Sequence, residues 1–309
     1  MTPLPHRTRI VVLILAAMTL VAMPLVARAD YPAFEATLTE PGGVIDLSAP
    51  HHLAVSSDEI KAWVERAATA LTHFYGRYPV KHVSITVLPG GSDVNGAVEY
   101  DGRRIEIHVS GDTTHADLVA DWMLTHEMFH LSQPELDDDY TWMSEGMADY
   151  LEPVARVRIR QITPERFWRD LVEGMPQGLP KPGDRGLDHT HTWGRTYWGG
   201  SLYWLIADIH VRQKTDNKKS VRDAARAVLD AGGDGSQDWN IDRLLDVYDS
   251  GVGVTVFKDL HNEMGGKPVM VDLDELWKSL GVIFDGQNIT FNDAAPLANI
   301  RRGIIAPEK

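Results

Sequence analysis

The spacing of apolar residues divides the chain into a mixed first part and a helical second part. Up to about residue 110, short runs of alternating apolar and polar residues predict strands. One longer segment has an apolar face at helical spacing from Ile60 to Phe74. Ser56 or Ser57 is placed to cap its start, and Gly76 to end it. The predicted strands are 34–38, 44–47, 81–88 and a hairpin, 97–110, that turns at Asp101-Gly102.

The second part follows a run, residues 114–131, that has apolar residues at helical spacing and meets no Gly or Pro until Pro134. This run predicts one helix, which carries the sequence HEMFH at residues 126–130. Residues 175–193, rich in Pro, Gly, Asp and His, are interpreted as a long loop and a candidate lid. The predicted helices downstream are 141–158, 164–173, 196–214, 220–229, 241–250, 255–263 and 273–280.

These patterns predict an α+β fold in which a small N-terminal mixed sheet with helices is followed by a mainly helical C-terminal lobe. We interpret residues 30–309 as a single unit with the functional site between its two lobes. The sheet lobe is expected at 30–133, the helical lobe at 134–280, and a tail without strong periodicity at 281–309.

The first 29 residues are predicted to be a secretory signal peptide. Arg7 and Arg9 precede an apolar run, residues 10–26, and Ala27-Arg28-Ala29 offers a small-residue cleavage site. Cleavage after Ala29 would place the mature protein in the periplasm or outside the cell. The alternative is an uncleaved anchor, because the run approaches the length of a membrane span. No other stretch is long and apolar enough to cross a bilayer, so no span is expected after cleavage.

Charge and cysteine content exclude several classes of protein. The chain has 30 Lys and Arg against 44 Asp and Glu, a net charge of −14, and the predicted signal removes no acidic residue. Such a chain lacks the electrostatic basis for binding nucleic acid, and no nucleic-acid partner is expected. Because there is no cysteine, disulfides and thiolate ligands are excluded, and any zinc must be held by histidine and carboxylate.

The HEMFH segment has the ligand spacing of a zinc site. On a helix, His126 and His130 stand one turn apart on the same face, where two neutral imidazoles can share one Zn²⁺. Glu127 lies beside them and could act as a general base, which completes the H-E-x-x-H pattern. The alternative is two histidines and a solvated glutamate on an ordinary amphipathic helix.

A catalytic zinc needs a third protein ligand, and Glu145 is the next candidate along the chain. It lies on the following predicted helix, and Asp149 stands one turn further on the same face, where it could accept the free N–H of a ligating histidine. Gly146 and Ala148 are small residues that permit close helix packing, which favours a buried carboxylate. The alternative is a solvated Glu and Asp on a surface helix.

HEMFH followed by WMSEGMADYLEP resembles the gluzincin metallopeptidases, and most closely the aminopeptidase N and glycyl aminopeptidase families. The resemblance implies a thermolysin-like zincin core and a peptide or protein substrate. It implies that His126, His130 and Glu145 bind Zn²⁺, that Glu127 is the general base, and that Asp149 supports a ligand. The segment between His130 and Glu145 is shorter than in those families.

The sequence from Arg195 onward, RTYWGG, is similar to the helix of those families that opens with Y-x-K-G. By that resemblance, Tyr197 donates a hydrogen bond to the oxyanion of the tetrahedral intermediate. The family lysine is replaced by Gly199. The alternative is that Tyr197 is a core or interface residue in an aromatic-rich helix.

Residues 95–100, NGAVEY, resemble the substrate-binding strand G-A-M-E-N of aminopeptidase N. The resemblance implies that Gly96 and Ala97 contact the substrate backbone and that Glu99 holds its free α-amino group. The alternative is that Glu99 faces Arg103 or Arg104 across a hairpin.

Together these features predict an exported, zinc-dependent metallopeptidase, with aminopeptidase activity as one form of it. The alternatives are an endopeptidase or processing protease with the same site, and a non-catalytic zinc-binding scaffold protein.

Overall fold

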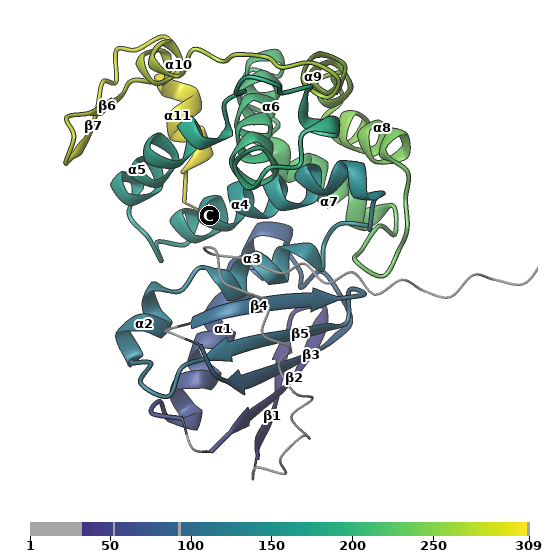
Figure 1. Cartoon of the computed structure of the whole chain (residues 1–309), viewed down its shortest axis with the longest axis vertical. Helices are drawn as coiled ribbons and strands as arrows, with labels where there is room; N and C mark the ends of the chain where they lie inside the picture. Colours follow the sequence, from purple (N-terminus) through teal and green to yellow (C-terminus); the bar gives the residue numbers. More distant parts are fainter. Residues whose placement is uncertain (1–32, 52, 92–93, 308–309) are drawn as a thin grey trace, which may run out of the picture.

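The computed structural model describes residues 33–51, 53–91 and 94–307, and the predicted signal peptide lies outside these ranges. A sheet lobe and a larger helical lobe meet where α3 (Met123–His130) lies against α4 (Thr141–Arg158), as Figure 1 shows. The predicted α+β class is therefore confirmed. No helix among the described residues is both long and apolar enough to cross a membrane.

Five strands form the sheet of the N-terminal lobe: β1 (Ala33–Glu40), β2 (Gly43–Pro50), β3 (His82–Pro89), β4 (Val94–Tyr100) and β5 (Arg104–Val109). Their order is β1-β2-β3-β5-β4. The central pairs β2–β3 and β3–β5 are parallel, whereas β1–β2 and β4–β5 are antiparallel, so the sheet is mixed. β4 is an edge strand, and it is the strand that lies next to α3 (Figure 1).

The helix predicted over Ile60 to Phe74 is α1 (Ser57–Tyr75), which packs against β1 and β2. It starts at a capping box in which the Ser56 side chain accepts from the backbone N–H of Glu59, whose carboxylate accepts from Ser56. It ends at Gly76, whose φ of 81° is the left-handed conformation that glycine adopts without strain. Along β2, β3 and β5, every second residue is buried. Ile45, Ile85 and Ile107 are among these residues and are fully buried.

The single helix predicted over residues 114–131 is wrong: the chain forms α2 (His115–Ala120), breaks, and restarts as α3. The break is at Asp121, which has an extended conformation and whose carboxylate accepts from the backbone N–H groups of Met123 and Leu124. The Trp63 indole donates to the same carboxylate at 2.9 Å. Asp121 therefore caps the short helix that carries HEMFH and ties it to α1.

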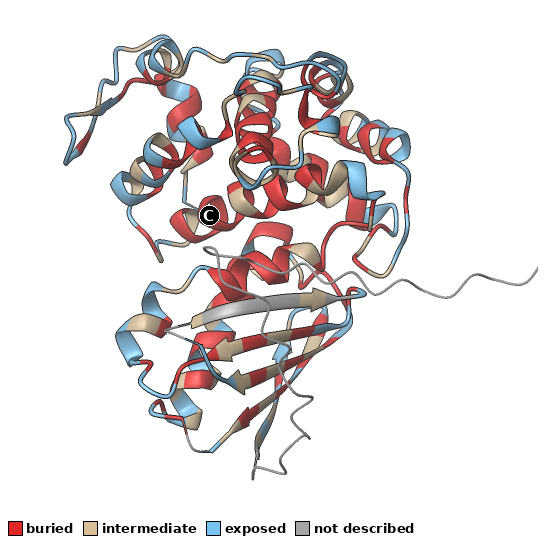
Figure 2. Ribbon diagram, in the orientation of Figure 1, coloured by how far each residue is buried: buried red, intermediate tan, exposed pale blue. Residues whose placement is uncertain are grey.

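The helical lobe is built around α4 and α6 (Gly200–Lys214), which approach closely at two glycines. A Cβ added to Gly146 would lie 2.2 Å from the backbone of Gly200, so neither helix could carry a larger side chain there. Figure 2 shows buried residues concentrated along α3, α4 and α6. The remaining helices are α5 (Pro164–Gly174), α6 (Gly200–Lys214), α7 (Val221–Asp230), α8 (Ile241–Val252), α9 (Phe257–Met264), α10 (Leu273–Leu280) and α11 (Ala298–Ile304).

Two regions differ from the expected pattern. The helix predicted to start at residue 196 begins with a π-helical turn, η4 (Arg195–Gly199), before α6. The tail, which lacks a clear period, folds into a short hairpin of β6 (Val282–Phe284) and β7 (Ile289–Phe291), followed by α11. Both regions depend on contacts with distant parts of the chain that a local pattern does not encode.

Candidate metal centre

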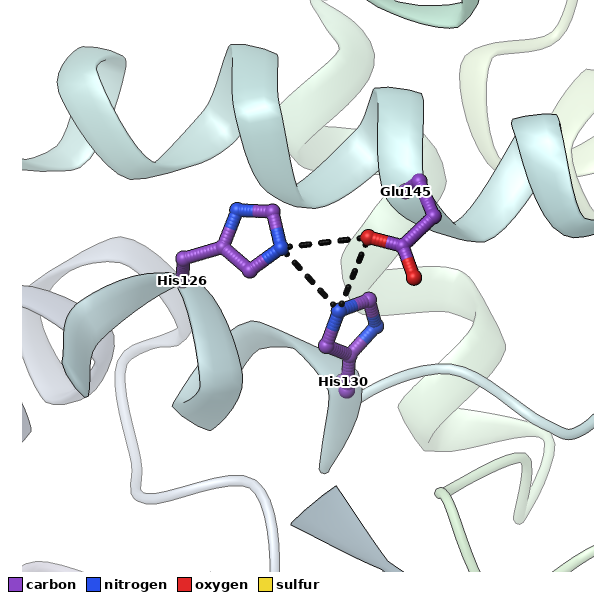
Figure 3. A group of neighbouring side chains, drawn as sticks. All are labelled: His126, His130 and Glu145. Atoms are coloured by element: carbon purple, nitrogen blue, oxygen red, sulfur yellow. Dashed lines mark hydrogen bonds and ion pairs between the residues drawn. The ribbon is translucent and has the colours of Figure 1, made fainter. Parts of the chain in front are cut away.

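Three side chains from α3 and α4 point their ligand atoms at one place (Figure 3). His126 Nε2 lies 3.2 Å from His130 Nε2 and 3.2 Å from Glu145 Oε2, and His130 Nε2 lies 3.5 Å from Glu145 Oε2. Zinc bound at about 2.0–2.1 Å in tetrahedral geometry places its ligand atoms about 3.3–3.4 Å apart. The three separations therefore fit three corners of a zinc tetrahedron. Among the described residues, this is the one group of three such side chains that could hold a metal ion.

The local structure explains this convergence. His126 and His130 are one turn apart on α3, so their rings project from the same face. Glu145 comes from the first turns of α4, which packs directly against α3. His126 and Glu145 are buried and His130 is partly exposed, so His130 is the most exposed of the three ligands.

Each imidazole has a second partner on its other nitrogen. Asp149 Oδ1 lies 3.2 Å from His126 Nδ1, as the spacing between Glu145 and Asp149 predicts. Ser144 Oγ lies 3.2 Å from His130 Nδ1, a contact that sequence analysis did not foresee. Such outer partners fix the tautomer and orientation of ligating histidines. In both rings they leave Nε2 to face the common centre.

The charges of the site favour a cation at its centre. Burial opposes ionisation of Glu145, but His130 and His126 outweigh it and bring its pKa down to about 2. Burial likewise opposes protonation of His126, yet the carboxylates of Asp149 and Glu145 raise its pKa well above the usual value. The donor set therefore suits a divalent cation with nitrogen and oxygen ligands.

Glu127 is buried next to the ligands and contacts the edge strand β4. Burial raises the pKa of its carboxyl, His130 and His126 oppose this shift, and the backbone N–H of Glu99 donates to it. Glu99 lies in β4, so the edge strand helps to hold the carboxyl that could serve as a base. A raised pKa is typical of a group that can accept and return a proton near neutral pH.

Tyr197 lies beside the centre, in the π-helical turn η4. Its ring stacks on that of His126 with centroids 6.5 Å apart. Burial and the carboxylates of Glu145, Asp149 and Glu127 all raise the pKa of its hydroxyl, which therefore stays protonated as a hydrogen-bond donor. The structure thus brings Tyr197 to the metal centre rather than into the hydrophobic core.

The turn that carries Tyr197 is held by a buried ion pair. Arg195 Nε lies 2.8 Å from Asp184 Oδ2, with both side chains at most 4% exposed, and Arg195 Nη1 donates to the Gly178 carbonyl at 2.6 Å. The connection between α5 and α6 is anchored a second time at Asp188, which accepts from the Trp142 indole at 2.9 Å. The long predicted loop is thus fastened to α4 and η4.

The carboxylate of Glu99 contacts the hairpin turn, a contact that was not predicted from the sequence. Its carboxylate accepts from the backbone N–H of Gly102 in the hairpin turn, and its residue partner across the sheet is Ile105. Burial raises the pKa of this carboxyl to about 8, although the charge of the nearby His130 acts to lower it. Gly96 and Ala97 lie in β4, where the pairing with β5 shifts register, and their side chains are not among those described.

Several residues that shape the centre were not predicted from the sequence. Ser144 stands next to Glu145, so a search for polar residues flanking the third ligand could have found it. Asp121 and Asp184 act through tertiary contacts and give no local signal. The histidines of the long loop do not reach the centre: His191 faces Asp139 at 3.7 Å, and His189 is exposed.

No protein-family model matches the sequence, and no curated protein matches it. Solved structures do match it in fold. One is an aminopeptidase N family protein from Idiomarina loihiensis, with a TM-score of 0.65, 14% identity, and coverage of 82% of this chain and 50% of that one. Another is the M1 zinc metallopeptidase from Deinococcus radiodurans, with a TM-score of 0.53, 15% identity, and coverage of 78% and 53%.

A mutant of the Deinococcus radiodurans enzyme bound to a Tyr-Ser-Ala substrate matches with a TM-score of 0.53, 15% identity, and coverage of 78% of this chain and 54% of that one. The fold is therefore that of the zinc metallopeptidases of the aminopeptidase N type, as the HEMFH and WMSEGMADYLEP motifs predict. The chain spans about half the length of these structures.

Proposed function

We propose that this chain is a zinc-dependent metallopeptidase that hydrolyses peptide bonds. The observation that carries the proposal is the tetrahedral spacing of His126, His130 and Glu145, with Glu127 buried beside them. A bound zinc ion would polarise the scissile carbonyl and lower the pKa of the attacking water. The fold of the aminopeptidase N type supports the same reaction class.

The other residues around the ligands have separate roles in the reaction. Glu127 accepts the proton of the attacking water and returns it to the leaving amine, and the N–H of Glu99 keeps its carboxyl in position. The Tyr197 hydroxyl donates to the developing oxyanion. Asp149 and Ser144 hold the two imidazoles with Nε2 toward the centre.

We propose aminopeptidase activity as the mode of cleavage, with endopeptidase activity as the alternative. Glu99 supports this choice because its carboxyl is mostly enclosed, and it lies on the edge strand beside Glu127. A substrate α-ammonium group would supply the positive charge that this enclosed carboxyl lacks. An internal stretch of peptide carries no such charge.

The test compares peptides with a free α-amino group with the same peptides N-acetylated. We expect free-amine peptides to be cleaved at least about 10-fold faster, since one charge-assisted hydrogen bond would be lost on acetylation. Glu99→Gln should reduce this preference and leave cleavage of acetylated peptides unchanged. Equal or faster cleavage of the acetylated peptides would establish the endopeptidase alternative.

We also propose that the protein is exported, with residues 1–29 removed. The support is the arrangement of Arg7 and Arg9, the apolar run and Ala27-Arg28-Ala29. N-terminal sequencing of the protein expressed from its full-length sequence in a bacterial host should find Asp30 as the first residue. Recovery of the intact N-terminus in the membrane fraction would support the anchor instead.

A further inference from the structure

The distribution of tryptophan is uneven around the metal centre. Of the nine tryptophans, Trp122 is 40% exposed and Trp193 is 49% exposed, while the other seven are buried or half-buried. An indole offers a large apolar surface, and leaving one in water is costly unless a partner covers it. These two exposed rings therefore call for an explanation that the rest of the fold does not give.

Both exposed rings contact a ring of the centre. Trp122 meets His126 edge to face, with centroids 5.6 Å apart, and Trp193 lies 5.8 Å from Tyr197. Because His126 and Tyr197 stack on each other, the four rings form one row of successive contacts in the order Trp122, His126, Tyr197, Trp193. A candidate metal ligand and the proposed oxyanion donor are in the middle of this row, and an exposed tryptophan contacts each of them.

Two acidic residues already have partners: Asp121, next to Trp122, and Asp139, which faces His191 near Trp193 in the chain. Asp121 accepts from the Trp63 indole and from the start of α3. Asp139 faces His191, two residues before Trp193, at 3.7 Å. Apolar indole surface rather than a carboxylate is therefore the main group that each end of the row offers to a ligand.

On the basis of the proposed peptidase function, we propose that Trp122 and Trp193 are specificity residues that bind large apolar side chains on the two sides of the scissile bond. A peptide whose carbonyl lies at His126 and Tyr197 would place one neighbouring side chain toward each indole. The favoured substrates are peptides with Phe, Leu or similar residues flanking the cleaved bond.

The test uses two sets of peptides that carry Phe, Ala or Lys, one set varying the residue before the cleaved bond and the other the residue after it. We expect the wild-type protein to prefer Phe over Ala by about 10-fold in kcat/KM in both sets, the factor that corresponds to covering one indole face. Trp122→Ala should remove the preference in one set, and Trp193→Ala in the other. In the set that each variant affects, kcat/KM should fall more for the Phe peptide than for the Ala peptide.

Ile283→Ala is the matched control, because Ile283 is 51% exposed in β6, away from α3 (Figure 1). This variant should keep the wild-type preference for Phe over Ala in both sets of peptides. A preference of the wild-type protein for Lys, an equal loss on all peptides in the tryptophan variants, or no change in those variants would each overturn the assignment.

Binding separates this assignment from the proposed function. Calorimetry with zinc-loaded Glu127→Gln protein and the same peptides needs no turnover. Tighter binding of Phe than of Ala peptides, lost in Trp122→Ala or Trp193→Ala, would support the subsites even if the wild-type protein hydrolysed nothing. Equal binding of Phe and Ala peptides would overturn the subsites, whereas hydrolysis would still stand on its own measurement.

Discussion

The two sides of the candidate active centre are held in place by different kinds of structure. On one side, His126, His130 and Glu145 project from regular helices that pack against each other. On the other side, Tyr197 sits in a π-helical turn that an irregular connection fastens through the buried pair of Arg195 and Asp184. The ligands depend on helical periodicity, whereas the tyrosine depends on long-range contacts of an irregular connection.

This difference determines how precisely each side can hold its functional groups. Helices with locked side chains hold ligand atoms to a fraction of an ångström, which metal binding requires. A π-helical turn displaces side chains from the regular helical direction and is common at functional sites. The second arrangement brings Tyr197 over His126, but it makes its position sensitive to distant residues.

Removal of the metal should have the largest effect, because it disables the ligand side entirely. A strong chelator is expected to abolish hydrolysis, and added zinc to restore it. Zinc at 1,000 times its dissociation constant should stabilise the fold by about 4 kcal/mol, visible as a rise in the thermal midpoint. Full activity in protein shown to be free of metal would contradict the account.

Tyr197→Phe should come next, since it removes the proposed oxyanion donor and keeps the ring. We expect kcat to fall by about 100-fold with little change in KM, the range found for loss of one such donor. Zinc content should be unchanged, because the ligand atoms are untouched. A variant with wild-type kcat would assign Tyr197 a packing role only.

Asp184→Asn tests the connection that holds Tyr197. It leaves the buried Arg195 without its counter-charge, which should cost about 3 kcal/mol of stability and lower kcat by about 10-fold at full zinc occupancy. Asp139→Asn is the matched control, because its pair with His191 is exposed and should contribute little. Equal effects of the two variants on kcat would show that the buried pair does not position Tyr197.

Asp121→Ala should have the smallest effect and should act on the ligand side. Loss of its bonds to the start of α3 is expected to cost about 1 kcal/mol of stability, measured by denaturant unfolding. Zinc affinity should fall only a few-fold, because α4 and the sheet still hold the helix. Unchanged stability would mean that Trp63 and the cap contribute nothing to the placement of α3.

Most of the structure on the ligand side could be predicted from the sequence. Residues 141–158, predicted as a helix, are helical in the structure, and the spacing of Glu145 and Asp149 correctly placed both near His126. These predictions succeed because helical periodicity alone sets the direction of a side chain. The same periodicity failed at residue 121, where a side-chain cap held by Trp63 from 58 residues away overrides the local preference for helix.

Much less of the structure around Tyr197 could be predicted from the sequence. The prediction of a regular helix from residue 196 missed the π-helical turn, which depends on Asp184 and Gly178 in the preceding connection. The contact of the Glu99 carboxylate with the Gly102 backbone was also not predicted, because a contact within a hairpin turn gives no signal in the sequence pattern. Contacts between irregular segments leave no periodic signal.

The central claim is that His126, His130 and Glu145 bind zinc while Glu127 performs the proton transfer. Its most direct test measures zinc content and peptide hydrolysis together in wild type, Glu127→Gln and Glu145→Ala. We predict about one zinc per chain in wild type and Glu127→Gln, weak binding in Glu145→Ala, and hydrolysis by the wild type alone. Wild-type hydrolysis by Glu127→Gln, or zinc retained at full affinity by Glu145→Ala, would contradict the account.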